Sequence, residues 1–259
     1  MPELPDLQVF SRNLTKELAG KKVKKVAIPV TKKLNVSAAK LKKALEGNTL
    51  KEVVRVGKHL QFVFKDGTIV GLHLMLHGKL FFFDKKNENK HTICEILFND
   101  GSGLAITDFQ KMATLTLNPE EKDTPDALAK EVNAKYLQQH FKDKKTPVKN
   151  IITDQDVITG IGNAYADEIL WDARLSPFSV AGKVPAPKIS QLAKSIKSVL
   201  KKAEKQIQKE HPGIIGGEER DFMQIHNAHK THSPTGAEIK KQAFKGRKTY
   251  YTEEQELFE

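Results

Sequence analysis

The sequence predicts an α+β protein in which strands come first, helices follow and a small hairpin ends the chain. Between about residues 51 and 117, short runs rich in β-branched and aromatic residues are separated by turn signals, which is typical of an antiparallel sandwich or barrel. From about residue 125 to 209, apolar residues recur at helical spacing. The tail over 223–259 returns to short strand-like pieces around Ser233–Gly236 and Lys245-Gly246.

Two helices are expected before the strands. The first covers residues 5–18, because Pro5 suits a first helical position and apolar residues follow at three- and four-residue spacing. The second covers 38–46 and ends at Gly47. Short turns such as Asp66-Gly67 join the strands that follow, and they favour antiparallel pairing over βαβ units.

The second half of the chain is predicted to be mainly helical. The expected helices cover residues 125–141, 147–152, 163–173 and 187–209. A loop with three glycines follows at 211–220. The three expected domains cover residues 1–120, 121–222 and 223–259.

The charge of the chain indicates the class of partner. Lys and Arg number 43 against 32 Asp and Glu, which gives a formal net charge of +11. Such an excess favours polyanions, with nucleic acid first and an anionic membrane surface second. No apolar run is long enough to span a membrane and no signal peptide is visible. The single cysteine, Cys94, excludes an internal disulfide and a multi-cysteine zinc site, so we expect a protein of a bacterial-type cytosol with no membrane partner.

The N-terminus has the chemistry of a reagent. Pro2 follows Met1, and removal of the methionine exposes a secondary amine. An α-amino group has a pKa of about 8, so a useful fraction is free base near neutrality. Attack on an aldehyde-level carbon gives an iminium, which is an electron sink. Glu3 lies beside it as a proton donor or acceptor. On these residues alone, a helix lead-in with a capping carboxylate is the simpler interpretation.

Five segments in order change that interpretation. They are MPELPD at the start, VGKHLQF at 56–62, HLMLHG at 73–78, GIGNAYADEILWDARLSP at 160–177 and RKTYY at 247–251. Together they resemble the formamidopyrimidine-DNA glycosylase and endonuclease VIII family. The resemblance implies an N-terminal antiparallel β-sandwich with flanking helices, a helix-two-turn-helix domain and a terminal hairpin finger. It also implies a monomer that binds damaged double-stranded DNA and needs no cofactor.

By this resemblance, Pro2 attacks C1′ of the damaged nucleotide and Glu3 protonates the sugar ring oxygen. Lys58 sits over the phosphate and sugar of the lesion, with a solvated strand lysine as the alternative. Base loss leaves an iminium, and β- then δ-elimination cuts the strand on both sides. Asp6 replaces the glutamate of the family and reaches one methylene less far, which puts its contact to the flipped nucleotide in doubt.

Two residues resemble the phosphate contacts of the family. Asn163 follows a glycine turn that opens a helix, where backbone N–H groups and the helix dipole favour an anion. Arg247 follows Gly246 at a hairpin turn and can bind a phosphate through two hydrogen bonds. A helix cap without ligand and a solvated turn are the respective alternatives.

The residues that fill the gap left by a flipped base depart from the family. Leu76 stands at the position of the wedge methionine. Gln110 replaces the arginine that reads the orphaned cytosine in relatives specialised for 8-oxoguanine, and Met112 replaces the wedging phenylalanine, with a core methionine as the alternative. The segment 213–223 is also short for a lid over a flipped purine. These departures predict a preference for oxidised pyrimidines, hydantoins or ring-opened lesions over 8-oxoguanine.

The finger departs as well. The positions that match the four zinc cysteines common in the family are His232, Thr235, Thr252 and Gln255. Only His232 is a good zinc ligand, so we expect a zincless finger with no metal, held by the packing of Phe244, Tyr250 and Tyr251.

Three functions remain open on the sequence. The first is a DNA glycosylase/AP lyase of base excision repair. The second is a catalytically silent DNA-binding paralogue, which the changes at Asp6, Gln110 and Met112 keep in play. The third, a basic protein that binds RNA or ribosomes, is supported by charge alone.

Overall fold

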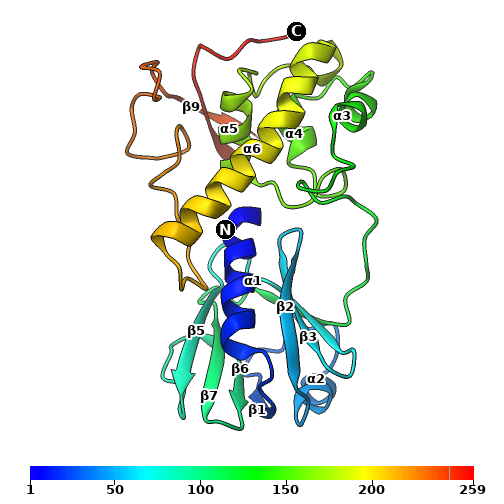
Figure 1. Ribbon diagram of the computed structural model, residues 1–259, viewed down its shortest axis with the longest axis vertical. Coiled ribbons are helices and arrows are strands. Elements are labelled where there is room, and N and C mark those ends of the chain that lie inside the picture. The colour runs from blue at the N-terminus through cyan, green and yellow to red at the C-terminus, as the bar shows by residue number, and fades with distance from the viewer. Residues whose placement is uncertain (245) are drawn as a thin grey trace. The chain divides into compact units, whose positions relative to one another are not determined.

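The computed structural model describes residues 1–244 and 246–259, and it does not describe the side chain of Phe244. The chain divides into two compact units (Figure 1). The N-terminal unit contains Met1–Lys122 together with Ile207–Glu218, and the C-terminal unit contains Asp123–Gln206 together with Glu219–Glu259. No helix in the described part of the chain has both the length and the apolar character that a membrane crossing requires.

The N-terminal unit is a sandwich of two four-stranded antiparallel sheets, as predicted. The first sheet has the order β1-β6-β7-β5, with β1 at Val23–Ala27, β6 at Thr92–Phe98, β7 at Ser102–Thr107 and β5 at Lys79–Asp84. The second has the order β2-β3-β4-β8, with β2 at Leu50–Val56, β3 at His59–Phe64, β4 at Ile69–His73 and β8 at Thr114–Leu117. Alternate residues of β3 point inward, which is the pattern of a strand with one buried face.

Two helices flank these sheets. Helix α1, Leu4–Leu18, buries an apolar stripe in the same core as the sheets: Leu7, Phe10, Leu14 and Leu18. Helix α2, Ala38–Leu45, begins at Ser37, whose hydroxyl accepts a hydrogen bond from the N–H of Lys40. Both helices lie close to their predicted bounds because their apolar periodicity is strong.

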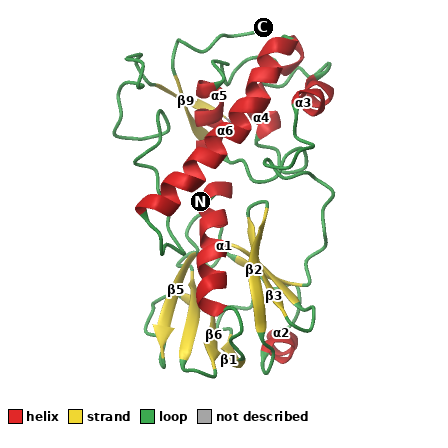
Figure 2. Cartoon of the chain, in the orientation of Figure 1, coloured by secondary structure: helices red, strands yellow, loops and turns green. Residues whose placement is uncertain are grey.

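The C-terminal unit consists of helices, of which α6 is long, and a hairpin (Figure 2). The helices are α3 (Ala134–Phe141), α4 (Val148–Ile152), α5 (Asn163–Asp172), the 3-10 helix η1 (Ala181–Lys183) and α6 (Ala186–Glu210), whose last residues belong to the N-terminal unit. The hairpin pairs β9, Lys240–Phe244, with β10, Arg247–Tyr251. The predicted turn residue Lys245 lies outside the described residues.

The predicted helix over 125–141 is wrong in its first half. Residues 125–133 form turns, and only α3 is helical. The N–H of Ala127 donates to the carbonyl of Thr159, and the N–H of Thr159 donates to the carbonyl of Pro125. The Asn133 side chain then accepts a hydrogen bond from the N–H of Tyr136 and starts the helix. Tertiary pairing therefore overrides the helical periodicity of this segment.

Candidate active site and nucleic-acid interface

Glu3 and Asp6 hold each other at the start of α1. The backbone N–H of Glu3 donates to Asp6 Oδ2 at 2.9 Å, and the Glu3 carboxylate accepts the N–H of Asp6 in return. This is a capping box, and both carboxylates are almost fully buried. Asp6, which is one methylene shorter than the glutamate of the family, therefore has a structural role here: its carboxylate fixes the backbone of Glu3.

Pro2 is buried directly before this capping box. Met1 precedes it, and the Met1 amino group forms an ion pair with Glu218. While Met1 is attached, the nitrogen of Pro2 is a peptide nitrogen whose lone pair is delocalised. Removal of Met1 converts this atom into the secondary amine that the predicted chemistry needs.

Lys58 lies in the tight turn between β2 and β3, next to Gly57, whose φ of +56° suits glycine. Arg55 braces this turn against α1. Its guanidinium donates to the carbonyl of Gly57 at 3.0 Å and to Gln8 Oε1 at 2.9 Å. Lys58 is partly buried, and its position is therefore set by a turn that is fastened to the helix carrying Glu3.

His73, to which the sequence assigned no role, belongs to the same region. Its pKa is lowered to about 4, first by burial and then by the positive charges of His59 and Lys58. The N–H of Met75 donates to His73 Nδ1 at 3.1 Å. The neutral ring therefore has its proton on Nε2 and is a hydrogen-bond donor without a positive charge. The only signal in the sequence is its place at the start of the HLMLHG segment, which does not separate it from a core histidine.

The turn after β4 presents Leu76. The N–H of Gly78 donates to the carbonyl of Leu74, and a Cβ on Gly78 would lie 2.3 Å from that oxygen, so only glycine closes the turn this tightly. Met75 has a φ of +53°, a conformation that costs energy for a side chain of its size. The exposed fraction of Leu76 is 62%. A rigid turn thus holds an apolar side chain in solvent.

The loop after β7 presents Gln110 and Met112 in a similar way. The loop is fixed by Asp108, whose buried carboxylate accepts three backbone hydrogen bonds. The donors are the N–H groups of Gln110 at 2.9 Å, Met112 at 2.7 Å and Ala113 at 2.8 Å. Met112 is exposed and not part of the core, so the alternative interpretation as a core methionine is wrong. Phe109, to which the sequence assigned no role, is more exposed still.

Asn163 is the first residue of α5 and follows the turn at Gly160–Gly162. Its Nδ2 donates to the backbone carbonyl of Lys248 at 2.9 Å. Its Oδ1 is buried and has no hydrogen-bond partner among the described residues. The helix start and the hairpin strand β10 are therefore joined by the side chain that was predicted to bind a phosphate.

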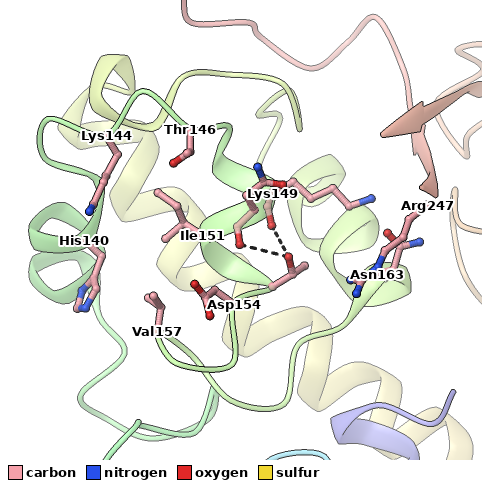
Figure 3. A pocket seen from close by; sticks show the side chains of 11 residues that line it. His140, Lys144, Thr146, Lys149, Ile151, Asp154, Val157, Asn163 and Arg247 are labelled. Atoms are coloured by element: carbon pink, nitrogen blue, oxygen red, sulfur yellow. Dashed lines mark hydrogen bonds between the residues drawn. The ribbon is translucent and has the colours of Figure 1, made fainter. Parts of the chain in front are cut away.

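Asn163 and Arg247 line one pocket of about 680 Å³ (Figure 3). Figure 3 shows the two side chains together at one side of it, with His140 and Lys144 at the other. Arg247 is exposed on β10. The structure therefore brings together two predicted phosphate contacts that are 84 positions apart in the chain.

A buried ionic network fixes β10 against α5. Asp167 of α5 accepts the N–H of Tyr250 at 3.0 Å and lies 2.6 Å from Lys149 Nζ and 2.7 Å from His226 Nδ1. Lys149 also donates to the hydroxyl of Thr249 at 2.8 Å. Asp167, Lys149 and Thr249 are buried, so the network is shielded from solvent. It sets the position of the strand that carries Arg247.

In the finger, Thr235 and Thr252 stand at positions that match zinc cysteines of the family, and both make hydrogen bonds within the protein. The hydroxyls of Thr235, Thr252 and Ser233 donate to Glu254 Oε2 at 2.8, 3.2 and 3.3 Å. Arg174 pairs with the same oxygen at 2.9 Å. These contacts lower the pKa of Glu254, with the hydrogen bond from Thr235 as the largest cause.

Gln255 is also engaged, because it accepts the N–H of Thr252 at 2.8 Å and donates to the carbonyl of Leu175 at 2.9 Å. His232 lies beside the hydroxyl of Thr231 at 3.0 Å. Among the residues that the structure describes, no three His, Cys, Asp or Glu side chains are grouped to hold a metal ion. The residues present in the finger do not fit a zinc site.

The predicted site residues fall into two groups. Those of the N-terminal unit are Pro2, Glu3, Asp6, Lys58, Leu76, Gln110 and Met112, and those of the C-terminal unit are Asn163 and Arg247. Contacts within the first group join Glu3 to Asp6, and the second group shares one pocket. Their functional roles stay predictions.

Comparison with known proteins agrees with this geometry. Residues 1–115 match the formamidopyrimidine-DNA glycosylase N-terminal domain, and residues 124–211 match the formamidopyrimidine-DNA glycosylase H2TH domain. A formamidopyrimidine-DNA glycosylase from Lactobacillus gasseri is 30% identical over 267 residues, which cover 97% of each chain.

Solved structures show the same fold. A crystal structure of a complex between the LlFpg protein, a THF-DNA and an inhibitor has a TM-score of 0.88 and 25% identity, and the match covers 97% of this chain and 98% of that one. A complex between the Lactococcus lactis Fpg and an abasic site containing DNA has a TM-score of 0.87 and 24% identity, with the same coverage. The chain belongs to the formamidopyrimidine-DNA glycosylase family, whose members are DNA glycosylases with AP lyase activity and an H2TH DNA-binding domain.

Proposed function

We propose that the chain, once Met1 is removed, is a bifunctional DNA glycosylase/AP lyase that excises oxidised bases through a Schiff base on Pro2. The observation that carries this proposal is the buried capping box of Glu3 and Asp6, which stands directly after Pro2 in a chain of this family. It fixes a carboxyl group one residue away from the nucleophile, so orientation of the two groups is set before substrate binds.

The proposed reaction proceeds in balanced steps. The Pro2 nitrogen forms a bond to C1′ of the damaged nucleotide, and the bond from C1′ to the base breaks with its electron pair leaving on the base. The N–H proton of Pro2 is transferred to the departing base, which leaves a neutral amine on C1′. Protonation of the ring oxygen by Glu3 opens the sugar and gives the iminium. Loss of a C2′ proton then breaks the C3′–O bond, and a second elimination breaks the C5′–O bond. Water finally releases Pro2.

Binding of the DNA backbone is assigned to Lys58, Asn163 and Arg247. The turn fastened by Arg55 supports Lys58, and the pocket shared by Asn163 and Arg247 supports the other two. A helix N-terminus and an arginine in one pocket are both suited to a phosphate, by dipole and by paired hydrogen bonds.

The finger is proposed to be zincless. Glu254 supports this proposal, because its carboxylate joins Thr235 and Thr252 of the finger to Arg174, which follows α5. Tyr250 adds apolar packing and is buried with Ile225 and Ile239. Tyr251 packs edge-on against Phe178 at 5.0 Å. A hydrogen-bonded carboxylate and these side chains can hold the hairpin without a metal.

The proposed substrates are oxidised pyrimidines, hydantoins and ring-opened lesions in preference to 8-oxoguanine. The segment after α6 supports this preference, because part of it is committed to the N-terminal core. Ile215 is buried there, and the carbonyl of Ile214 accepts a hydrogen bond from Asn13 Nδ2 at 2.7 Å. Little chain is left for a lid over a flipped purine. Selection then rests on how easily a base leaves the stack.

Gel analysis of cleaved strand ends tests the proposal. Protein that begins at Pro2 should cut abasic-site DNA and leave a phosphate on each side of the gap. Pro2→Gly keeps a primary amine and should cut more slowly, and Glu3→Gln should slow base release more than strand cleavage. An intact strand with correctly processed protein would instead favour a catalytically silent DNA-binding paralogue. Excision rates from matched duplexes check the lesion preference, and fast release of 8-oxoguanine opposite cytosine alone would contradict it.

A further inference from the structure

Phe109 is a large apolar side chain held in solvent by a rigid loop. Its exposed fraction is 56%, next to Gln110 and Met112, which are also exposed. Asp108 fixes this loop through three backbone N–H groups, so exposure of the ring is not the result of a disordered segment. An exposed aromatic ring on an ordered loop of a basic protein suggests a contact surface.

A second aromatic ring supports Phe109 from the turn after β4. The centroids of His77 and Phe109 lie 4.6 Å apart with the rings tilted by 47°. His77 directly follows Leu76, the predicted wedge. The two presenting loops, 74–78 and 108–113, are thus joined through this ring pair, and Phe109 has a fixed place relative to Leu76.

The same pair forms one wall of a pocket of about 290 Å³ in the N-terminal unit. Its lining combines aromatic rings with basic groups, and no carboxylate is among the lining residues that the structure describes. The aromatic and basic lining residues are Phe81, Phe109, His77, His91, Lys79 and Lys90. Rings beside lysines suit a nucleobase that stacks and a phosphate that is neutralised, since every base has a π-face.

We propose that Phe109, supported by His77, stacks on the unpaired base opposite the lesion. This inference rests on the proposed function, because flipping of the damaged nucleotide leaves the opposite base without a partner, as an abasic site also does. Stacking is independent of base identity, unlike hydrogen bonding to base edges. With the neutral amide of Gln110 alongside, Phe109 allows the site to accept several opposite bases.

A cycle of protein and DNA changes tests the proposal. The protein begins at Pro2, and the DNA has a tetrahydrofuran abasic analogue opposite either adenine or a second tetrahydrofuran. Phe109→Ala should weaken binding to the first duplex by about tenfold and leave binding to the second almost unchanged, because the second has no base to stack. Phe109→Tyr should retain the wild-type affinity for both duplexes.

Phe82→Ala is the matched control. Phe82 is also an exposed phenylalanine of the N-terminal unit, but it does not line this pocket, so both affinities should be unchanged. Equal loss on the two duplexes with Phe109→Ala, or no loss on either, would overturn the proposal. Borohydride trapping on a natural abasic site separates the two claims: if Phe109→Ala is trapped like wild type, the catalytic proposal stands whatever the stacking result.

Discussion

The side chain of Asn163 donates a hydrogen bond from Nδ2 to the backbone carbonyl of Lys248 at 2.9 Å. This contact joins the start of helix α5 to strand β10, one residue from Arg247. A phosphate bound in their shared pocket would meet Asn163 and Arg247 together. The two residues should therefore act as one binding unit and not as two independent contacts.

Arg247→Ala should weaken binding to lesion-containing and undamaged duplexes alike, because a phosphate contact does not read sequence or damage. Loss of one phosphate contact should flatten the dependence of log affinity on log salt by about one unit of slope. Fluorescence anisotropy across a salt series measures this. Lys248→Ala is the control, since Lys248 contributes its backbone carbonyl to the Asn163 contact and that group is retained. A loss confined to lesion DNA would instead assign Arg247 to the damaged base.

Glu254→Gln should loosen the finger without any metal being involved. The contacts to Thr235 and Arg174 lower the pKa of Glu254, so the ionised carboxylate is the stabilising form. Its contribution is present above the unfolded pKa of glutamate and is lost as the pH falls through the lower folded pKa. At neutral pH the variant should lose a few degrees in Tm, and the loss should shrink in acid. The neighbouring Glu253→Gln, which removes only the ion pair with Lys240, is the control.

Elemental analysis completes this test. Purified wild-type protein should contain zinc well below one atom per chain, and EDTA should leave its DNA binding unchanged. One tightly bound zinc per chain would show that the finger closes in a way that the Glu254 contacts do not explain.

His73 should make the N-terminal unit sensitive to acid. Burial lowers its pKa to about 4, below the value of about 6.5 for an unfolded histidine. Between about pH 6.5 and pH 4, His73 is protonated in the unfolded chain but not in the folded chain. The free energy of unfolding therefore falls as the pH drops through this range. His73→Gln should flatten this part of a Tm-against-pH curve. An unchanged curve would mean that the pKa of His73 is the same in the folded and the unfolded protein.

Much of the fold was predictable because it depends on local patterns. The apolar stripe of α1 and the inward-facing residues of β3 are periodic in the sequence, and burial follows that periodicity. The helix expected over 125–133 failed for the opposite reason. There the backbone of Ala127 pairs with Thr159, a partner 32 positions away that no local pattern reveals.

The candidate site likewise contains residues that local patterns reveal and residues that only long-range contacts reveal. Pro2, Glu3 and Asn163 were proposed as site residues from motifs in which neighbouring residues stand at fixed spacing, and their roles stay predictions. Glu254 was not found, because Thr235 and Arg174, its partners, come from distant segments that meet only in the folded chain. His73 was missed because its environment, and not its neighbours in sequence, sets its pKa.

The proposed Schiff base on Pro2 is tested most directly by borohydride trapping followed by peptide mapping. Protein that begins at Pro2 is mixed with a duplex that contains a natural abasic site, reduced and digested, and the peptides are examined by mass spectrometry. We predict a stable protein–DNA adduct in which the sugar remnant is attached to the nitrogen of Pro2, and no adduct with protein that retains Met1. An adduct on a lysine such as Lys58, or the absence of any adduct with correctly processed protein, would contradict it.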